Sequence, residues 1–364
     1  MIFFSRKIFS SHNNAFGVDI SDLSIKVVEI RENGKGMVVS GFGSAPMVSG
    51  SVVDGEIVRP EVVVATLQKA IESSQPKRIR NKKVFCALPE TRAFLRIINI
   101  PTMKSEEIQE AIKWEVEANI PLTLDQVYYD WQVLDVPIGR ESGKISVLVV
   151  AVARKVVDQF IEVVELAGLQ PVGMEIESIA QSRSLAVEKS NTAASIIVDL
   201  GDRRTSFLML IGNVPCFTSS IPLSGQSMTD AIAKMISVSY DEAERLKRKF
   251  GIGSFIKQDP IFRSVEPILE NLVAEIEKSI DFFVSGLKYA DHVDRVILCG
   301  GGARAKGIIP YLSSRLGREV ELGDPWVNFG LAGKLPMIDR EVSVQYSTAI
   351  GLALRGLNFY ENIS

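Results

Sequence analysis

The sequence predicts an α/β protein with two similar lobes and a smaller α+β unit inserted in the first lobe. A pattern of apolar residues, an aspartate and a polar turn occurs twice, and the second aspartate, Asp199, follows the first, Asp19, by 180 positions. A later apolar run leads into three glycines, Gly300–Gly302. Residues 84–173 read as strand-strand-helix-strand-strand-helix, which is typical of a compact α+β unit. Two copies at half-chain spacing indicate a duplicated core.

The repeated aspartate and turn have a chemical use. In each copy the first strand is expected to end at the aspartate, and a tight turn with hydroxyl side chains follows. Backbone N–H groups and hydroxyls in such a turn converge on one point and suit phosphate oxygens. The carboxylate suits the water shell of Mg²⁺, which itself binds phosphate. Each turn alone reads as an ordinary solvated hairpin. The presence of two such turns, together with the later glycines, favours two facing turns that hold a polyphosphate between them.

Composition narrows the function classes. The chain has 364 residues, of which 46% are hydrophobic and 23% charged, as is ordinary for a globular protein with a buried core. Its net charge of −3 disfavours general nucleic-acid binding. The three cysteines are scattered, and the two histidines, His12 and His292, are far apart. We therefore expect buried, reduced thiols and discard a disulfide framework, a histidine zinc site and a Ser-His-Asp triad.

Two segments have two readings each. The stretch Met1–Phe9 is apolar but broken by Arg6 and Lys7, and it reads as a frayed terminus or as a tail that contacts a partner or a membrane. The basic run Pro76–Lys83 reads as a solvated loop or as a patch for an anionic membrane or an acidic partner. No apolar run reaches the roughly 18 residues that a membrane-spanning helix needs.

The periodicity of apolar residues gives the order of the parts. Helices are expected at Pro60–Glu72, after Ser105 as N-cap, at Ser264–Tyr289 and at Ser347–Leu357. The expected parts are a tail at 1–14, the first part of lobe I at 15–83, the inserted unit at 84–173, a connecting helix of lobe I at 174–190, lobe II at 191–345, and a C-terminal helix at 346–364 that returns to lobe I.

These parts, in this order, resemble the actin-like ATPase superfamily. The turns at Asp19 and Asp199 and the strand that runs into Gly300–Gly302 resemble its nucleotide elements. Glu177–Ala180 resembles its first connecting segment, and Leu223–Gln226 resembles the Gly-rich turn that follows the second phosphate turn. Ala243–Lys247 resembles its ribose and adenine segment, and Ser347–Arg355 resembles its second connecting helix. The resemblance implies a two-lobed actin-like ATPase fold with ATP·Mg²⁺ between the lobes.

Within that superfamily the inserted unit resembles the PilM family, whose members are cytoplasmic FtsA-like proteins of type IV pilus assembly. The segments Glu107–Glu117, Asn119–Leu122 and Tyr129–Leu134 carry this resemblance, and Gly351–Arg355 also fits. The resemblance covers nearly the whole chain, except for about the first dozen residues, which read as a terminus.

The resemblance implies roles for particular residues. It implies that Asp19 and Asp199 orient the waters of Mg²⁺ and that Glu177 positions an attacking water. The residues implied to contact or approach the nucleotide are Ser21, Ser24, Lys26, Gly201, Thr205, Gly225, Glu244, Lys247, Gly300, Gly301 and Gly302. The alternative for Glu177, Glu244 and Lys247 is an ordinary exposed helix charge. The alternative for Lys26 is an exposed strand residue.

The two turns depart from the superfamily at several positions. Ser21 stands where glycine is usual, and Ser224-Gly225 replaces a pair of glycines. Asp22 and Asp202 stand where small neutral residues are commoner. Carboxylates near phosphate weaken binding unless Mg²⁺ or a nearby lysine or arginine offsets their charge. These departures bear on ATP hydrolysis more than on the fold.

The resemblance implies a scaffold at the inner face of the inner membrane. Such a protein binds the N-terminal cytoplasmic peptide of the inner-membrane protein PilN in a groove that involves the inserted unit. ATP tunes this affinity, with weak ATPase activity at most. Homo-oligomerisation stays open. The alternatives are an FtsA-like division protein, a type II secretion scaffold, or a small-molecule kinase, although the sequence offers no strong candidate for a kinase's substrate base.

Overall fold

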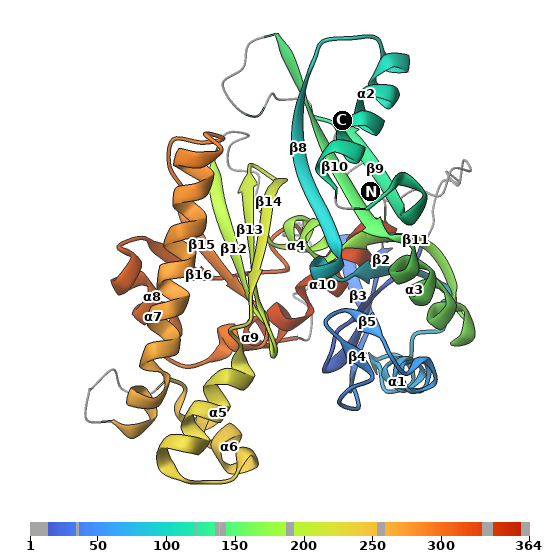
Figure 1. Cartoon of the computed structure of the whole chain (residues 1–364). Coiled ribbons are helices and arrows are strands. Elements are labelled where there is room, and N and C mark those ends of the chain that lie inside the picture. The colour runs from blue at the N-terminus through green and yellow to red at the C-terminus, as the bar shows by residue number, and fades with distance from the viewer. Residues whose placement is uncertain are drawn as a thin grey trace. The chain divides into compact units, whose positions relative to one another are not determined.

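The computed structural model describes residues 14–33, 36–120, 122–134, 138, 143–186, 193–252, 259–329 and 338–357 (Figure 1). The chain divides into two compact units. Unit 1 comprises residues 1–186, 325–337 and 346–364, and unit 2 comprises residues 187–324 and 338–345. Residues 1–13 of the expected tail lie outside the described residues.

Unit 1 is built around a six-stranded sheet with the order β11-β7-β1-β2-β3-β6. Its strands span Phe16–Ile20 (β1), Ser24–Asn33 (β2), Gly36–Pro46 (β3), Gln75–Pro76 (β6), Lys83–Leu88 (β7) and Gln170–Ile176 (β11). The first three strands form an antiparallel meander, while β1 pairs in parallel with β7, and β7 with β11. Every residue of β1 is buried, as expected of a central strand with helices on both faces of its sheet.

Unit 2 repeats this strand order in a five-stranded sheet, β14-β13-β12-β15-β16. The strands span Ala194–Leu200 (β12), Thr205–Ile211 (β13), Val214–Ile221 (β14), Arg295–Cys299 (β15) and Glu319–Leu322 (β16). The register of the first hairpin also matches, because Asp19 lies opposite Lys26 and Asp199 opposite Ser206. The duplicated α/β core expected from the sequence is therefore confirmed.

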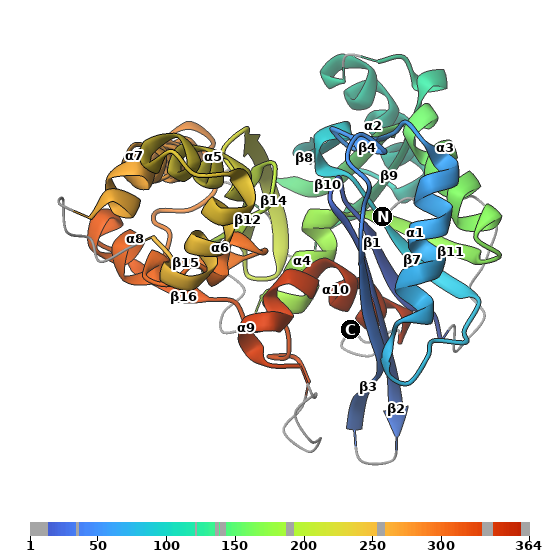
Figure 2. The same ribbon diagram turned by 90° about the horizontal axis from the view of Figure 1, so that it is seen from below.

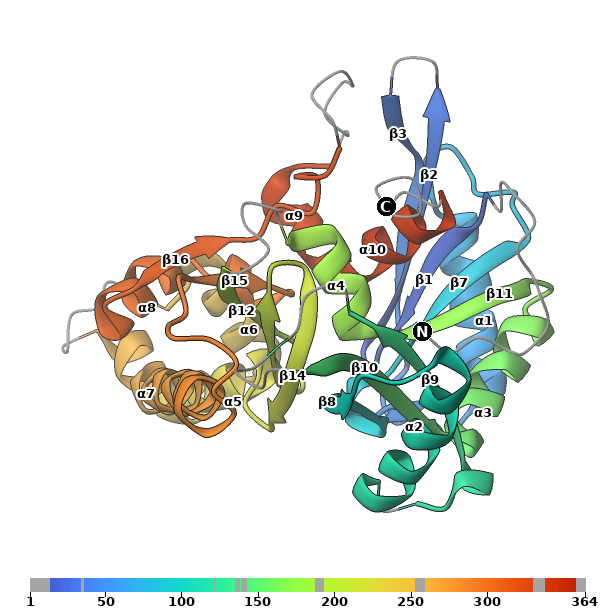
Figure 3. The ribbon, with the colours of Figure 1, turned by 90° about the horizontal axis from the view of Figure 1, so that it is seen from above.

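Helices cover both faces of the unit 1 sheet (Figures 2 and 3). They are Pro60–Glu72 (α1), Arg154–Leu166 (α3), Glu177–Leu185 (α4) and Ser347–Gly356 (α10), and a short hairpin of Val52–Val53 (β4) and Glu56–Ile57 (β5) precedes α1. Helices α1 and α3 pack together on one face, and α4 and α10 on the other. Helix α1 has its predicted bounds, because Pro60 suits its first turn and Val63, Leu67 and Ala70 form a buried stripe.

Between β7 and α3 the chain forms a separate three-stranded antiparallel sheet, β8-β10-β9, with one helix across it. These elements, the inserted unit, are Ala93–Pro101 (β8), Ser105–Asn119 (α2), Val127–Val133 (β9) and Lys144–Ala153 (β10). Alternate strand residues face α2, and the shared core contains Ile100, Ile108, Ile112, Val116, Ile120, Val127, Val147, Val149 and Ala151. Strands β7 and β11, at the two ends of the expected range 84–173, pair instead in the six-stranded sheet.

The helices of unit 2 are Gly225–Ile236 (α5), Tyr240–Phe250 (α6), Pro260–Asp281 (α7), Ile308–Leu316 (α8) and Arg340–Ser343 (α9). Helix α7 begins earlier than expected, because Asp259 caps it by accepting the Ile261 N–H at 2.9 Å. In the inserted unit, Ser105 is the first residue of α2, and Lys104 occupies the N-cap position expected for Ser105. No helix within the described residues combines the length and hydrophobicity that crossing a bilayer requires.

Helix α10 lies very close to both β1 and α4. A Cβ atom on Gly17 would overlap the carbonyl oxygen of Ala349, and a Cβ atom on Gly351 would overlap that of Ala180. A Cβ atom on Gly356 would likewise overlap the carbonyl oxygen of Ala15, the residue before β1. Because packed backbones cannot give way to an added methyl group, glycine at these positions sets how closely the C-terminal helix approaches the first strand.

A buried charge cluster joins β11, α4 and α10 in unit 1. Glu175 is 1% exposed and accepts hydrogen bonds from Arg183 at 3.0 Å and from Arg355 at 2.7 Å. The Arg355 guanidinium also lies 4.7 Å from the centre of the Phe85 ring. Burial raises the pKa of a carboxyl, but the two guanidiniums outweigh it and hold the pKa of Glu175 below its ordinary value. The cluster is therefore ionised at neutral pH.

The three thiols, Cys86, Cys216 and Cys299, are free and buried, as expected from their scattered positions in the sequence. Burial raises the pKa of all three, that of Cys216 to about 12. The negative charges of Asp19 and Asp199 raise the pKa of Cys86 and Cys299 further. Thiolate, the reactive form, is therefore scarce at neutral pH.

The buried cluster predicts a large effect for Glu175→Gln. The variant should lower the free energy of unfolding of unit 1 by about 3–5 kcal/mol, because it leaves two buried guanidiniums without a carboxylate. Trp114, Trp131 and Trp326, the chain's three tryptophans, all belong to unit 1, so intrinsic fluorescence in a urea titration measures this change.

The matched control is Glu72→Gln, which also lies in unit 1 and is therefore followed by the same fluorescence. Glu72 pairs at 3.1 Å with Arg78, both side chains are exposed, and such surface pairs contribute at most about 1 kcal/mol. A loss of stability at Glu175 no larger than at Glu72 would show that the buried cluster does not hold α4 and α10 in place.

Candidate functional site

In unit 1, Asp19 lies on β1 one residue before its end, where the sequence pattern predicts a phosphate-type turn. The residue is 6% exposed, and the ammonium of its cross-strand partner Lys26 lies 3.7 Å from its carboxylate. The same ammonium donates a hydrogen bond to the Ser24 hydroxyl at 2.9 Å. Lys26 is thus held beside the turn and is not an exposed strand residue.

The Asp19 carboxyl group lies in a poorly solvated position. Burial raises its pKa, and the attraction of Lys26 lowers the pKa only in part. A carboxylate placed in this way gains from any further cation that approaches it, because charges attract most strongly where water is scarce. An oxygen donor of this kind suits hydrated Mg²⁺.

The first turn is closed by its own serines. The backbone N–H and the hydroxyl of Ser21 both donate to the Ser24 carbonyl, at 3.0 and 2.9 Å. The Asp22 carboxylate accepts the backbone N–H groups of Asp54 at 3.2 Å and Gly55 at 3.4 Å. These two residues connect β4 to β5, so Asp22 anchors a neighbouring hairpin with its charge directed at backbone donors.

Glu177, implied by resemblance to position a water, is the first residue of α4. Its carboxylate accepts the backbone N–H of Glu90 at 3.4 Å, and the Glu90 carboxylate accepts the backbone N–H of Ser178 at 3.2 Å. The two carboxylates fasten the start of α4 to the segment after β7. Sequence reasoning does not single out Glu90, because its contact with Glu177 joins residues 87 positions apart.

In unit 2, Asp199 lies opposite Ser206 of β13 and beside Cys299 of β15. Gly300, the residue after β15, packs directly on it, since a Cβ atom there would overlap the Asp199 carboxylate and lie 2.7 Å from the Leu200 carbonyl oxygen. Gly300 also has φ of +81°, a backbone conformation that favours glycine. Packing around Asp199 therefore requires glycine at this position.

The three consecutive glycines are not equivalent. A Cβ atom on Gly302 would lie 2.9 Å from Leu200, so that glycine too is required by packing. For a Cβ atom on Gly301, the nearest atom is the Asp202 carboxylate oxygen at 3.8 Å, which is an ordinary contact. The backbone of Gly301 is thus open on the side that a side chain would fill, and a ligand can approach it closely.

The turn after Asp199 is fastened to the start of α5. The Gly201 carbonyl accepts the Gly225 N–H at 3.0 Å, and the next carbonyl of the turn accepts the next N–H of α5 at the same distance. Thr205 is 0% exposed and donates its hydroxyl hydrogen to the Leu223 carbonyl at 2.7 Å. The N–H groups at the start of α5 and the Thr205 hydroxyl already donate within unit 2. Attraction of an anion to this end of α5 would therefore come chiefly from the helix dipole and from neighbouring backbone groups.

A network of side chains joins α5 to α6. Lys247 donates to the Thr229 hydroxyl at 2.7 Å and to the Gly225 carbonyl at 2.8 Å. It also pairs with Glu244 at 2.7 Å, and the buried Thr229 hydroxyl donates to the same carboxylate at 2.6 Å. Burial raises the pKa of this carboxyl, but hydrogen bonds from Lys247, Thr229 and Arg248 lower it to about 2.

Neither Glu244 nor Lys247 is an ordinary exposed helix charge, because their side chains are only 24% and 15% exposed. Thr229, which ties them to α5, is not found by sequence reasoning. A threonine inside a predicted helix carries no signal of its own, and its partners become visible only when α6 packs against α5.

Several of the predicted residues meet at one surface of unit 2. A Cβ atom on Gly225 would lie 3.5 Å from the Asp202 carboxylate and 3.6 Å from the Lys247 ammonium, both ordinary contacts. Together with Gly301 these residues form a surface that we call the unit 2 cradle. It combines exposed backbone at Gly301 with one cation and one anion, which suits a ligand with a charged polyphosphate and a metal ion.

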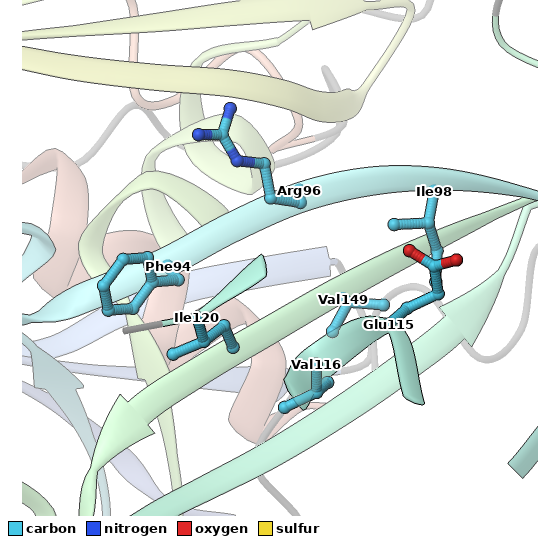
Figure 4. A pocket seen from close by; sticks show the side chains of 7 residues that line it. All are labelled: Phe94, Arg96, Ile98, Glu115, Val116, Ile120 and Val149. Carbon is cyan, nitrogen blue, oxygen red and sulfur yellow. The ribbon is translucent and has the colours of Figure 1, made fainter. Parts of the chain in front are cut away.

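The inserted unit contains a pocket that sequence reasoning does not predict (Figure 4). Its lining residues come from β8, α2 and β10 and are Phe94, Arg96, Ile98, Glu115, Val116, Ile120 and Val149. Figure 4 shows the Arg96 guanidinium directed away from the apolar side chains. Within the described strands β8 pairs with β10 alone, so its outer edge has main-chain groups for an extended segment.

Comparisons with known proteins cover almost the whole chain. A family model described as type IV pilus assembly protein PilM matches residues 17–357. The cell division protein FtsA of Pseudomonas aeruginosa is 23% identical in an alignment that covers 94% of this chain and 88% of its own.

Two solved structures support the fold. The PilM-PilN type IV pilus biogenesis complex has a TM-score of 0.79 at 27% identity and covers 94% of this chain and 98% of that chain. MreB5 of Spiroplasma citri bound to ADP has a TM-score of 0.53 at 13% identity and covers 96% of this chain and 99% of that chain. The architecture is therefore the actin-like ATPase fold with an FtsA-like inserted unit.

The glycines after β15 predict opposite outcomes for two substitutions. Gly300→Ala should lower the free energy of unfolding of unit 2 by more than about 2 kcal/mol, because the methyl group overlaps Asp199 and the backbone φ is positive. Gly301→Ala should change it by less than about 1 kcal/mol, because its φ of −64° suits alanine and the methyl group makes only an ordinary contact at 3.8 Å. Thermal unfolding followed by circular dichroism measures both, and equal shifts would contradict this account.

The network around Glu244 predicts a dependence of stability on pH. Because its pKa is about 2 in the folded chain and 4.5 ordinarily, the stabilisation is complete above about pH 4.5 and is lost as the pH falls towards 2. The difference in melting temperature between the wild type and Glu244→Gln should therefore be largest at neutral pH and shrink in acid. A difference that stays constant down to about pH 3 would show that this carboxylate is not held ionised by its partners.

Proposed function

Because the chain belongs to the PilM family of type IV pilus assembly proteins, we propose that it is an ATP-binding scaffold that recruits a pilus partner. The match over residues 17–357 supports the place of the chain in pilus assembly. The nucleotide and the partner are supported by two separate features, the unit 2 cradle and the pocket of the inserted unit.

The unit 2 cradle is the observation that carries the ATP proposal. Gly301 leaves backbone open where a side chain would stand, and Gly225 leaves room between the Asp202 carboxylate and the Lys247 ammonium. We assign the phosphates to this open backbone and the ribose and base to Glu244 and Lys247 on α6. The solved MreB5 structure that shares this fold is bound to ADP, which is consistent with a nucleotide on such a scaffold.

The carboxylates beside the two turns suit Mg²⁺. When bound, Mg²⁺ neutralises phosphate charge, and Asp199 would hold its waters as an oxygen acceptor. Asp19 provides the equivalent carboxylate in unit 1, where burial leaves it poorly compensated. The expectation that Ser21, Ser24 and Lys26 contact the phosphates of the same nucleotide stays a prediction.

We propose that ATP is bound with little turnover. The Glu177 carboxylate accepts a backbone N–H of Glu90, and the Thr205 hydroxyl hydrogen is donated to Leu223. A general base must be within hydrogen-bond reach of the proton that it removes, and a group committed to the backbone is less available for that role. These contacts support binding with little turnover. We propose that the nucleotide adjusts affinity for the partner and that the protein acts at the cytoplasmic face of the inner membrane.

For the partner we propose the N-terminal cytoplasmic peptide of a PilN-type protein. The similar solved structure is a complex of PilM with PilN. In this chain the edge of β8 that pairs with no other described strand offers main-chain groups, and the adjoining pocket offers apolar side chains such as Ile98 and Val116. An extended peptide gains affinity from main-chain hydrogen bonds and specificity from pockets for alternate side chains, so the two features together suit it.

Calorimetric titration of the protein with a PilN-type N-terminal peptide tests this proposal. We expect micromolar binding that becomes about tenfold tighter with ATP·Mg²⁺, as is typical of coupling between two sites. Asp199→Asn should remove the effect of ATP and leave the binding of the peptide alone unchanged. Asp281→Asn, an exposed aspartate on α7 in the same unit, is the matched control.

A substitution in the pocket separates the partner from the nucleotide. Ile98→Asp should abolish peptide binding and leave ATP binding intact, whereas Val133→Asp, at a 38% exposed position on β9, should affect neither. If the peptide does not bind with or without ATP, the PilN assignment is wrong. If it binds and ATP has no effect, the chain is a scaffold without nucleotide control.

A further inference from the structure

We propose that Asp202 makes nucleotide binding by this chain depend on a divalent cation, an inference that rests on the proposed ATP site. Asp202 is an exposed residue in the turn between β12 and β13. Its carbonyl accepts the Gln226 N–H at 3.0 Å, so its backbone is fixed against the start of α5. The turn therefore holds the residue in a defined place beside the unit 2 cradle.

The Asp202 carboxylate projects over the glycine backbone of the cradle. One carboxylate oxygen lies 3.5 Å from the position of a Cβ atom on Gly225 and 3.8 Å from that on Gly301. Gly301 is exposed and is the open backbone to which the phosphates are assigned above, whereas Gly225 beside it is buried. A phosphate that approaches Gly301 thus comes next to a carboxylate, and the two negative charges repel.

The pseudo-equivalent residue in unit 1 behaves differently. Asp22 occupies the same place in the first turn, three residues after its aspartate, but it accepts the backbone N–H groups of Asp54 and Gly55. The Asp22 carboxylate therefore faces the β4–β5 hairpin and is hydrogen-bonded to its backbone. Of the two acidic departures from the superfamily pattern, therefore, only Asp202 is set to meet a phosphate.

The Lys247 ammonium beside the cradle is engaged with other partners. Lys247 is committed to Glu244, to the Thr229 hydroxyl and to the Gly225 carbonyl. In the part of the chain that the structure describes, no lysine or arginine forms an ion pair with Asp202. A divalent cation that arrives with the nucleotide supplies the missing charge, because carboxylate and phosphate oxygens are both ligands for Mg²⁺ or its waters.

The consequence is selection between two forms of one ligand. Metal-free ATP presents phosphate charge directly to the Asp202 carboxylate and is disfavoured. ATP·Mg²⁺ presents a cation that the same carboxylate attracts, directly or through water. A neutral residue at this position would remove both effects, so the dependence on Mg²⁺ would weaken while the fold stays the same.

Titration of a fluorescent ATP analogue, with excess Mg²⁺ and with EDTA, tests this inference. In the wild type we expect EDTA to weaken binding by at least about tenfold, since charges this close interact strongly outside bulk water. In Asp202→Asn and Asp202→Ser that ratio should fall to about threefold or less, chiefly through tighter binding of the metal-free analogue. Asp22→Asn, which keeps an oxygen to accept its backbone hydrogen bonds, should retain the wild-type ratio.

The outcomes separate this inference from the function on which it rests. If no variant binds the analogue with or without Mg²⁺, the proposed ATP site is wrong and the inference is overturned with it. If the wild type and the Asp202 variants bind it with the same ratio, the site stands and the role of Asp202 is overturned. A change of ratio in Asp22→Asn equal to that in Asp202→Asn would also overturn it.

Discussion

The close approach of α10 to β1 and α4 is the constraint on which unit 1 depends. Gly17 and Gly351 allow it, because any side chain at either position would overlap a backbone carbonyl. The contact joins the first strand to the last described helix, so unit 1 closes only when the chain has returned from unit 2. The buried Glu175 then ties α10 to β11 through Arg355. Loss of this contact would therefore disturb the strand that carries Asp19.

The two units show how one topology supports two different turns. Both sheets place an aspartate near the end of their first strand and a parallel strand beside it. The residues around that aspartate have diverged: Lys26 compensates Asp19 across the hairpin, whereas Ser206 occupies the corresponding position opposite Asp199. In unit 2 the Lys247 ammonium on α6 is engaged with Glu244, Thr229 and Gly225. A duplicated fold thus gives two turns whose electrostatics are not interchangeable.

The sequence predicts the elements and the repeated aspartates well, because periodicity and repetition are local signals. Helix α1 has its predicted bounds, and the predicted duplication is seen in the strand order that the two sheets share. What cannot be predicted depends on distant partners. Asp22 and Asp202 read alike in sequence, and only the packing of the β4–β5 hairpin shows that the first is engaged. The role of Thr229 could not be predicted either, because its partners come from the packing of α6 against α5. The sheet to which β7 belongs could not be predicted, because a short apolar run does not indicate which sheet it joins.

The burial of the three native thiols makes the protein a convenient background for site-specific labelling. Maleimide dyes react with thiolate, which is scarce at cysteines whose pKa is raised by burial. Cysteines introduced at Leu166 in unit 1 and Met235 in unit 2, which are 60% and 48% exposed, would react first. Energy transfer between two dyes at these positions would then report the separation of the units in solution without removal of any native cysteine.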